Sequence, residues 1–149
     1  MGNVIVNTES MSIEGKSSFA MDTSFWEDLW DNYTNTFQDV VIHCWKEEEE
    51  IIEELRPKAI SILNEGLIKI ITVNLNDENH TYFRNNSIDP KGGLKWFMMF
   101  FNKDGDERLE IGHYGSEVIL YKVDEENAEK FISLFNSSAT THFYDENAD

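Results

Sequence analysis

The fold class follows from one stretch of sequence, KWFMMFFNKDGDERLEIGHYGSEVILYKV, which runs from Lys95 to Val123. Six apolar residues in a row, Trp96 to Phe101, precede a polar turn that contains Asp104-Gly105. A short apolar run bounded by turn residues is typical of a strand buried on both faces, and Asp-Gly supplies the positive φ angles of a tight hairpin. The stretch therefore predicts an antiparallel meander in which Trp96–Asn102 is the central strand. The other two strands are expected at Arg108–His113 and Glu117–Val123.

Helical signals dominate the sequence before this stretch. Ser24 and Glu27 have the spacing of a capping box, in which a hydroxyl and a carboxylate satisfy free amides of the first helical turn. Residues 39–45 contain three consecutive β-branched side chains, which favour a strand. The same residues also continue an apolar stripe at helical spacing, so both interpretations stay open and helix is slightly favoured. The stripe consists of Trp26, Leu29, Trp30, Tyr33 and Phe37.

A strongly acidic helix is predicted over Lys46–Glu54. Pro57 disfavours helix at the residue before it and suits the first turn of a new helical piece. We expect that piece to end at Gly66, which stands where a helix C-cap belongs. A strand over Leu67–Leu75, a turn at 76–79 and a returning strand at Thr81–Arg84 are expected to follow.

The chain is expected to form a single domain over residues 1–149. Residues 3–19 fit one or two short strands in an edge hairpin. Asp124 opens a last helix with negative charge at its positive pole, and the polar, acidic residues 137–149 form a tail that is expected to fray. The predicted architecture is α+β: an N-terminal helical half, then the antiparallel meander, then a C-terminal covering helix.

Composition restricts the possible partners. The 149 residues include 29 acidic and 12 basic side chains, for a net charge of −17. Such a chain repels phosphate backbones and anionic membrane surfaces, so neither nucleic acid nor membrane is an expected direct ligand. Long-range attraction would instead steer a basic protein toward it. A hydrophobic content of 40%, with 13% aromatic residues, is ample for a core and argues against global disorder.

The sequence also indicates a compartment. It shows no secretory signal and no apolar stretch near the roughly 18 residues of a membrane helix. Cys44 is the single cysteine, so no internal disulfide can form, and its apolar surroundings are typical of a small buried side chain. We therefore expect a cytoplasmic protein.

No catalytic motif is present. The four histidines are scattered singly, without the spacing of a zinc site. Residues 103–107 superficially suggest a calcium loop but lack its spaced carboxylates, so a hairpin turn is preferred. His113 beside Tyr114 could form an acid/base pair in a pocket, although polar residues late in a strand more often mark an exposed rim. The expectation is a protein that is not an enzyme, with no catalytic residue, no metal and no cofactor.

Exposed acids are the remaining functional signal. The predicted acidic helix could receive Lys and Arg side chains from a basic partner, and Trp45 could anchor the contact or belong to the core. The alternative is a merely solvated charged face. Asp28 and Asp31 would join the surface if the first helix packs alongside. The candidate partner-binding residues are Glu47, Glu48, Glu49, Glu50, Glu53, Asp28 and Asp31.

The chain as a whole resembles a bacterial immunity protein of the kind that neutralises the toxin of a contact-dependent growth inhibition system. The resemblance rests on the glutamate run Glu47–Glu50, on the segment Phe25-Trp26-Glu27-Asp28-Leu29-Trp30 and on the acidic meander. It implies a cognate toxin, a basic nuclease domain, whose active site or substrate groove is covered by acidic side chains. Steering would then raise the association rate, and buried anchors would slow dissociation.

A second hypothesis is a phage-encoded inhibitor that mimics nucleic acid and occupies the binding channel of a host enzyme. Regularly spaced exposed carboxylates would favour such mimicry. In this sequence the acids are clumped instead of spread at phosphate-like intervals, which argues mildly against it.

Overall fold

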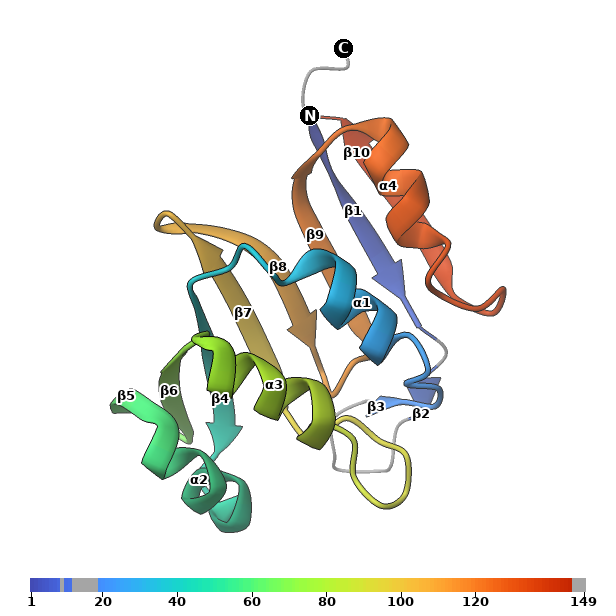
Figure 1. The fold of residues 1–149 in the computed structure, drawn as a ribbon. Helices are drawn as coiled ribbons and strands as arrows, with labels where there is room; N and C mark the ends of the chain where they lie inside the picture. Colours follow the sequence, from blue (N-terminus) through green and yellow to red (C-terminus); the bar gives the residue numbers. More distant parts are fainter. Residues whose placement is uncertain (9, 12–18, 146–149) are drawn as a thin grey trace.

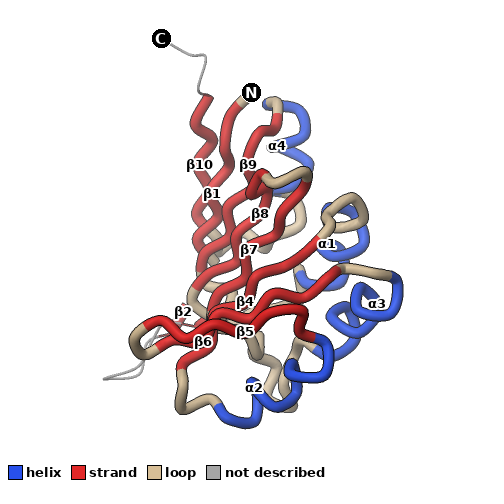
Figure 2. The backbone as a smooth tube through the Cα atoms, turned by 90° about the vertical axis from the view of Figure 1, so that its left-hand side faces the viewer, coloured by secondary structure: helices blue, strands red, loops and turns tan. Residues whose placement is uncertain are grey.

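The computed structural model describes residues 1–8, 10–11 and 19–145, and these form an α+β fold around one large antiparallel sheet (Figure 1). The order of its eight strands is β10-β1-β9-β8-β7-β4-β6-β5. The helices α1, α3 and α4 lie on one side of the sheet, with α2 at the end near β5 (Figure 2). The strands of the sheet are β1 (Gly2–Asn7), β4 (Asp39–Trp45), β5 (Ala59–Glu65), β6 (Ile68–Asn74), β7 (Met98–Lys103), β8 (Asp106–Gly112), β9 (Glu117–Val123) and β10 (Thr140–Asp145). The helices are α1 (Trp26–Tyr33), α2 (Glu49–Leu55), the 3₁₀ turn η1 (Arg56–Lys58), α3 (Asp77–Asn86) and α4 (Glu125–Ile132).

The predicted meander is confirmed as β7, β8 and β9, but its first strand begins at Met98 instead of Trp96, and β8, not that strand, lies in the middle of the three. Asp104 and Gly105 form a two-residue turn with φ angles of 53° and 81°, which places Lys103 opposite Asp106. The expectation that β7 is buried on both faces is wrong. Its alternate residues Met99 and Phe101 are fully buried under the helices, whereas Met98 and Phe100 are only half-buried on the other face.

The predicted N-terminal helical half is wrong, because strands are interleaved with helices throughout the chain. Residues 39–45 form β4, and pairing with β6 and β7 on both sides decides the ambiguity in favour of strand. The expected helical piece after Pro57 is limited to η1, and β5 follows it. Gly66, with φ of 60°, turns the chain into β6 instead of capping a helix. The predicted strand over residues 67–75 is confirmed as β6.

The expected turn and return strand after β6 are also wrong, because α3 occupies residues 77–86. Asn76 is its N-cap, and the Asn76 side chain accepts a hydrogen bond from the backbone N–H of Asn79 at 2.8 Å. The predicted capping box at Ser24 does not form: α1 begins at Trp26, and the Ser24 amide donates to Asp22 at 2.8 Å. The buried Trp26 and Trp30 donate their indole N–H groups to carbonyls of α3, which ties the two helices together.

The C-terminal helix is confirmed as α4, with Asp124 as its N-cap. The tail does not fray as a whole, because β10 pairs with β1 along six residues. Residues 146–149 lie outside the described part of the chain. The strand β1 lies between β10 and β9 instead of in an edge hairpin, and a separate two-stranded pair joins β2 (Ser10–Met11) to β3 (Phe19–Ala20).

Candidate functional site

The predicted acidic helix is shorter than expected, and its glutamates differ in exposure. Glu47 lies in the turn before α2, and α2 itself begins at Glu49. Glu47, Glu49 and Glu50 are exposed, and their side chains form no hydrogen bond or ion pair with other described residues. Glu53 is exposed as well and pairs with Arg56, with 3.0 Å between Oε1 and Nη2. Exposed pairs of this kind contribute little to stability, so four carboxylates remain accessible to a partner.

Glu48 points inward instead. Its Oε1 accepts a hydrogen bond from the backbone N–H of Trp45 at 2.9 Å, and its Oε2 accepts one from the Tyr114 hydroxyl at 3.1 Å. Burial raises the pKa of Glu48 above its usual value, although both hydrogen bonds act in the opposite direction. Glu48 therefore fixes the turn after β4 to the turn between β8 and β9.

An aromatic cluster surrounds this contact. The ring of Phe97 lies 4.8 Å from Trp45, 5.7 Å from His113 and 5.4 Å from Tyr114, measured between ring centroids. His113 and Tyr114 have φ angles of 49° and 54°, a left-handed conformation that costs about 1–2 kcal/mol per residue. Tyr114 holds this strained turn in place by donating two hydrogen bonds, one from its hydroxyl to the Glu48 carboxylate and one from its backbone N–H to the carbonyl of Phe97. Trp45 is half-buried at the margin of the cluster, next to the exposed glutamates.

Glu54 belongs to an internal network and not to the acidic surface. Its Oε2 lies 2.6 Å from the Nζ of Lys95 and also accepts a hydrogen bond from the hydroxyl of Tyr82 in α3. The ammonium of Lys58 lies 4.1 Å from the centre of the Tyr82 ring. These contacts join α2 and α3 to the segment before β7, so their role is structural.

The structure separates Asp28 and Asp31 from the acidic helix. Both side chains are exposed on α1, and α3 lies between α1 and α2 in the helical layer (Figures 1 and 2). Arg84 of α3 binds Asp31 through two hydrogen bonds of 2.7 and 2.9 Å, which lowers the pKa of that carboxyl. Arg84 also pairs with Glu27 at 3.0 Å. Six of the seven predicted acids are therefore divided between two exposed surfaces, one around α2 and one on α1, and the seventh, Glu48, points inward.

The opposite face of the sheet carries a second acidic feature that the sequence analysis missed. No described helix covers this face (Figure 2). Glu110 of β8 lies opposite Phe100 of β7 and Ile119 of β9, so a carboxylate is flanked by apolar side chains. Burial, together with the neighbouring Glu107 and Glu117, raises the pKa of Glu110 to about 7. In the sequence, a glutamate between Leu109 and Ile111 resembles an ordinary solvent-facing position, so nothing local reveals this environment.

The histidines and the cysteine do not assemble a reactive centre. His43 packs against Phe100, and His80 shares a hydrogen bond of 2.8 Å with the Thr34 hydroxyl. Within residues 1–8, 10–11 and 19–145, no group of three His, Cys, Asp or Glu side chains could hold a metal ion. Cys44 is fully buried, and burial raises the pKa of its thiol to about 12, which keeps it neutral and unreactive.

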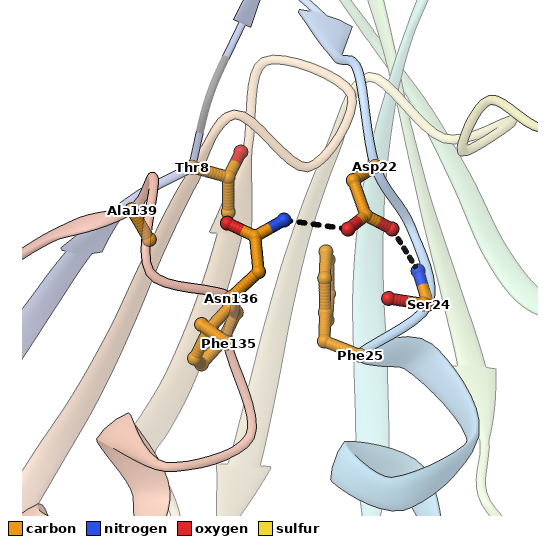
Figure 3. Close-up of a pocket in the computed structure, with 7 residues that line it drawn as sticks. All are labelled: Thr8, Asp22, Ser24, Phe25, Phe135, Asn136 and Ala139. Atoms are coloured by element: carbon orange, nitrogen blue, oxygen red, sulfur yellow. Dashed lines mark hydrogen bonds between the residues drawn. The ribbon is translucent and has the colours of Figure 1, made fainter.

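A small hollow lies between the start of α1 and the segment after α4 (Figure 3). The rings of Phe25 and Phe135 are 4.9 Å apart in its wall, and Asn136 donates a 2.6 Å hydrogen bond to Asp22 at its rim. The volume inside it that water-sized molecules can occupy is about 10 Å³, roughly the room that one water molecule needs, so the hollow is far too small for a small-molecule ligand. His113 does not line it, so this hollow is not the acid/base pocket that the sequence left open.

No family model, curated protein or solved structure matches this chain. No helix in the described ranges is long and apolar enough to cross a membrane. The function must therefore be inferred from the surfaces described above.

Proposed function

We propose that this protein is an immunity protein, which binds a basic nuclease toxin in the cytoplasm and blocks its activity. The contact surface is the acidic corner, defined as the exposed Glu47, Glu49, Glu50 and Glu53 together with Trp45. The observation that carries the proposal is the position of these accessible carboxylates beside a half-buried tryptophan on a fixed turn.

The chemistry of the acidic corner suits a basic protein. Carboxylates form charge-assisted hydrogen bonds with Lys and Arg, and Arg can bind them through two parallel bonds. A nuclease carries such cations to hold the phosphates of its substrate, so the same residues can be covered by an acidic inhibitor. The net charge of −17 adds long-range attraction, which raises the association rate at low salt.

The hydrogen bonds of Glu48 provide rigidity at the acidic corner. They link the turn that carries Glu47 to Tyr114 and to the backbone of Trp45. A surface that is already ordered loses less conformational entropy on binding. Trp45 then supplies an apolar contact of the kind that commonly contributes a large share of binding energy.

The test begins with a pull-down from the native host, in which the product of the adjacent gene is a candidate. A captured basic nuclease domain is then assayed for nucleic-acid cleavage with and without this protein. The charge-reversed variant Glu47→Lys, Glu49→Lys, Glu50→Lys should weaken binding by roughly ten- to a hundredfold at low salt. A matched control reverses three exposed acids elsewhere: Glu78, Glu126 and Glu129.

The control should lower affinity much less, because its charges act only at long range. Equal effects of the two variants would remove the acidic corner from the interface. Capture of a large host enzyme of nucleic-acid metabolism would favour the nucleic-acid mimic instead. A nuclease that is bound but stays active would overturn the inhibitory role.

A further inference from the structure

The strand β5 forms one end of the sheet, and its outer side has no strand partner within the described residues. Its inner side pairs regularly with β6 from Ser61 to Glu65, after an irregularity between Ala59 and Ser61. Along the outer side, backbone N–H and C=O groups are therefore available to a further strand. Natural proteins usually protect such an edge with charges, bulges or a covering segment.

The β5 edge also presents unusually exposed apolar side chains. Ile60 and Leu63 are 60% and 59% exposed, and Leu67 in the following turn is 72% exposed. The other edge of the sheet, β10, has a single large hydrophobic residue of this kind, Tyr144, at 53%. Exposing apolar side chains to water costs free energy, and a large exposed apolar surface often marks an interaction site. This argument favours β5 over β10 as the edge that binds a partner.

The apolar surface of β5 continues across the uncovered face of the sheet. Leu63 lies opposite Ile70 of β6, Ile70 lies opposite His43 of β4, and His43 lies opposite Met98 of β7. A strand added beside Leu63 would extend this row by one side chain. The row therefore gives an incoming strand an apolar contact in addition to its backbone hydrogen bonds.

Charge indicates which partner fits this edge. The interval from Glu47 to Glu65 contains seven glutamates but only two basic residues, Arg56 and Lys58. The helix α2 runs through η1 directly into β5 and lies at the same end of the sheet (Figure 2). Two copies of this chain would bring like charges together there, whereas a basic segment would meet complementary ones.

We propose that β5 is the docking edge for the partner, which adds an extended segment of alternating basic and apolar residues to the sheet as a ninth strand. This inference rests on the proposed function only in identifying that partner as a basic protein. Backbone hydrogen bonds to β5 supply the affinity, and the side chains of the segment supply the specificity. Its apolar residues cover Leu63, and its cations lie near the carboxylates of α2.

The edge can be tested without the natural partner. The probe is a synthetic peptide of about ten residues that alternates lysine and valine, the pattern of a half-buried strand. Amide hydrogen exchange is measured for the whole protein with and without the probe. The outward-pointing amides among residues 59–65 should exchange at least about tenfold more slowly, because they become hydrogen-bonded to the added strand. Residues 140–145 of β10 should not change.

A control peptide of equal charge, with proline in place of valine, separates strand pairing from electrostatic attraction, because proline cannot donate the required hydrogen bonds. The variant Leu63→Lys should abolish the protection, and Tyr144→Lys on the other edge should not. Unchanged exchange in β5, or equal protection by the proline peptide, would overturn the proposal. A dimer that Leu63→Lys dissociates would assign the edge to a second copy and also overturn it.

The two proposals can fail separately. A toxin that is bound and inhibited while β5 stays unprotected would refute the docking edge alone. If the peptide protects β5 but the pull-down from the native host captures no toxin, the immunity function alone would be refuted.

Discussion

Replacement of Glu110 by glutamine tests how the uncovered sheet face affects stability. Glutamine keeps the shape of the side chain and removes its charge. In the folded protein the pKa of Glu110 is about 7, compared with the usual value of 4.5, and burial is the largest cause. Above pH 7 the folded protein must therefore hold a carboxylate that the unfolded chain solvates better.

The sign and size of the effect follow from proton linkage. Because the folded pKa is the higher one, the folded state binds more protons than the unfolded state between pH 4.5 and 7. The contribution of Glu110 to stability is fully present below pH 4.5 and is lost as the pH rises through 7. The pKa difference corresponds to at most about 3 kcal/mol, and solvent screening of a partly exposed side chain reduces it to about 1–2 kcal/mol.

Urea denaturation of the wild type and Glu110→Gln at pH 5 and pH 8 measures this contribution. The variant should gain about 1–2 kcal/mol relative to the wild type between the two pH values. Glu129→Gln, on the exposed surface of α4, is the matched control and should show a much smaller change. A stability difference between Glu110→Gln and the wild type that is the same at both pH values would refute the reasoning.

Three further substitutions test the fold. Phe101→Ala should lower the free energy of unfolding by about 3–5 kcal/mol because it leaves a cavity in the core, whereas Phe100→Ala, on the uncovered face, should cost less than half as much in the same urea titration. Similar losses for both would show that β7 is covered on both faces. Asn76→Ala should cost about 1 kcal/mol by removing the N-cap of α3, measured by thermal unfolding followed by circular dichroism. An unchanged melting temperature would contradict that role.

Local sequence signals predicted an element correctly where the signal is compatible with only one structure. Asp104-Gly105 specifies a tight hairpin whatever surrounds it, and Asp124 caps α4 through its own side chain. Elsewhere one residue type serves two structures. Gly66 suits a helix C-cap or a hairpin turn, and pairing of β5 with β6 selects the turn. Asn76 was interpreted as part of a turn, although asparagine before two acids is also a helix N-terminus signal.

In the candidate site, too, some features were predictable from local sequence and others were not. The run of glutamates at Glu47–Glu50 predicted the exposed carboxylates of the acidic corner. It could not distinguish Glu48 from its neighbours, because the inward position of Glu48 depends on Tyr114, which is 66 positions away. The raised pKa of Glu110 likewise depends on strand register. Contacts between residues distant in sequence decide which acids are buried, and no periodicity reveals them.

The position of β1 has a consequence for the order of events during synthesis. Val6 lies opposite Val118 on one side and opposite Thr141 on the other. The strand β1 can therefore pair only after β9 and β10, which follow it far along the chain, have been synthesised, and closing such long loops slows folding. Until then its apolar side chains, which include the fully buried Val4 and Val6, stay exposed to solvent and to other chains. This side of the sheet is completed only when β1 takes its place between β9 and β10.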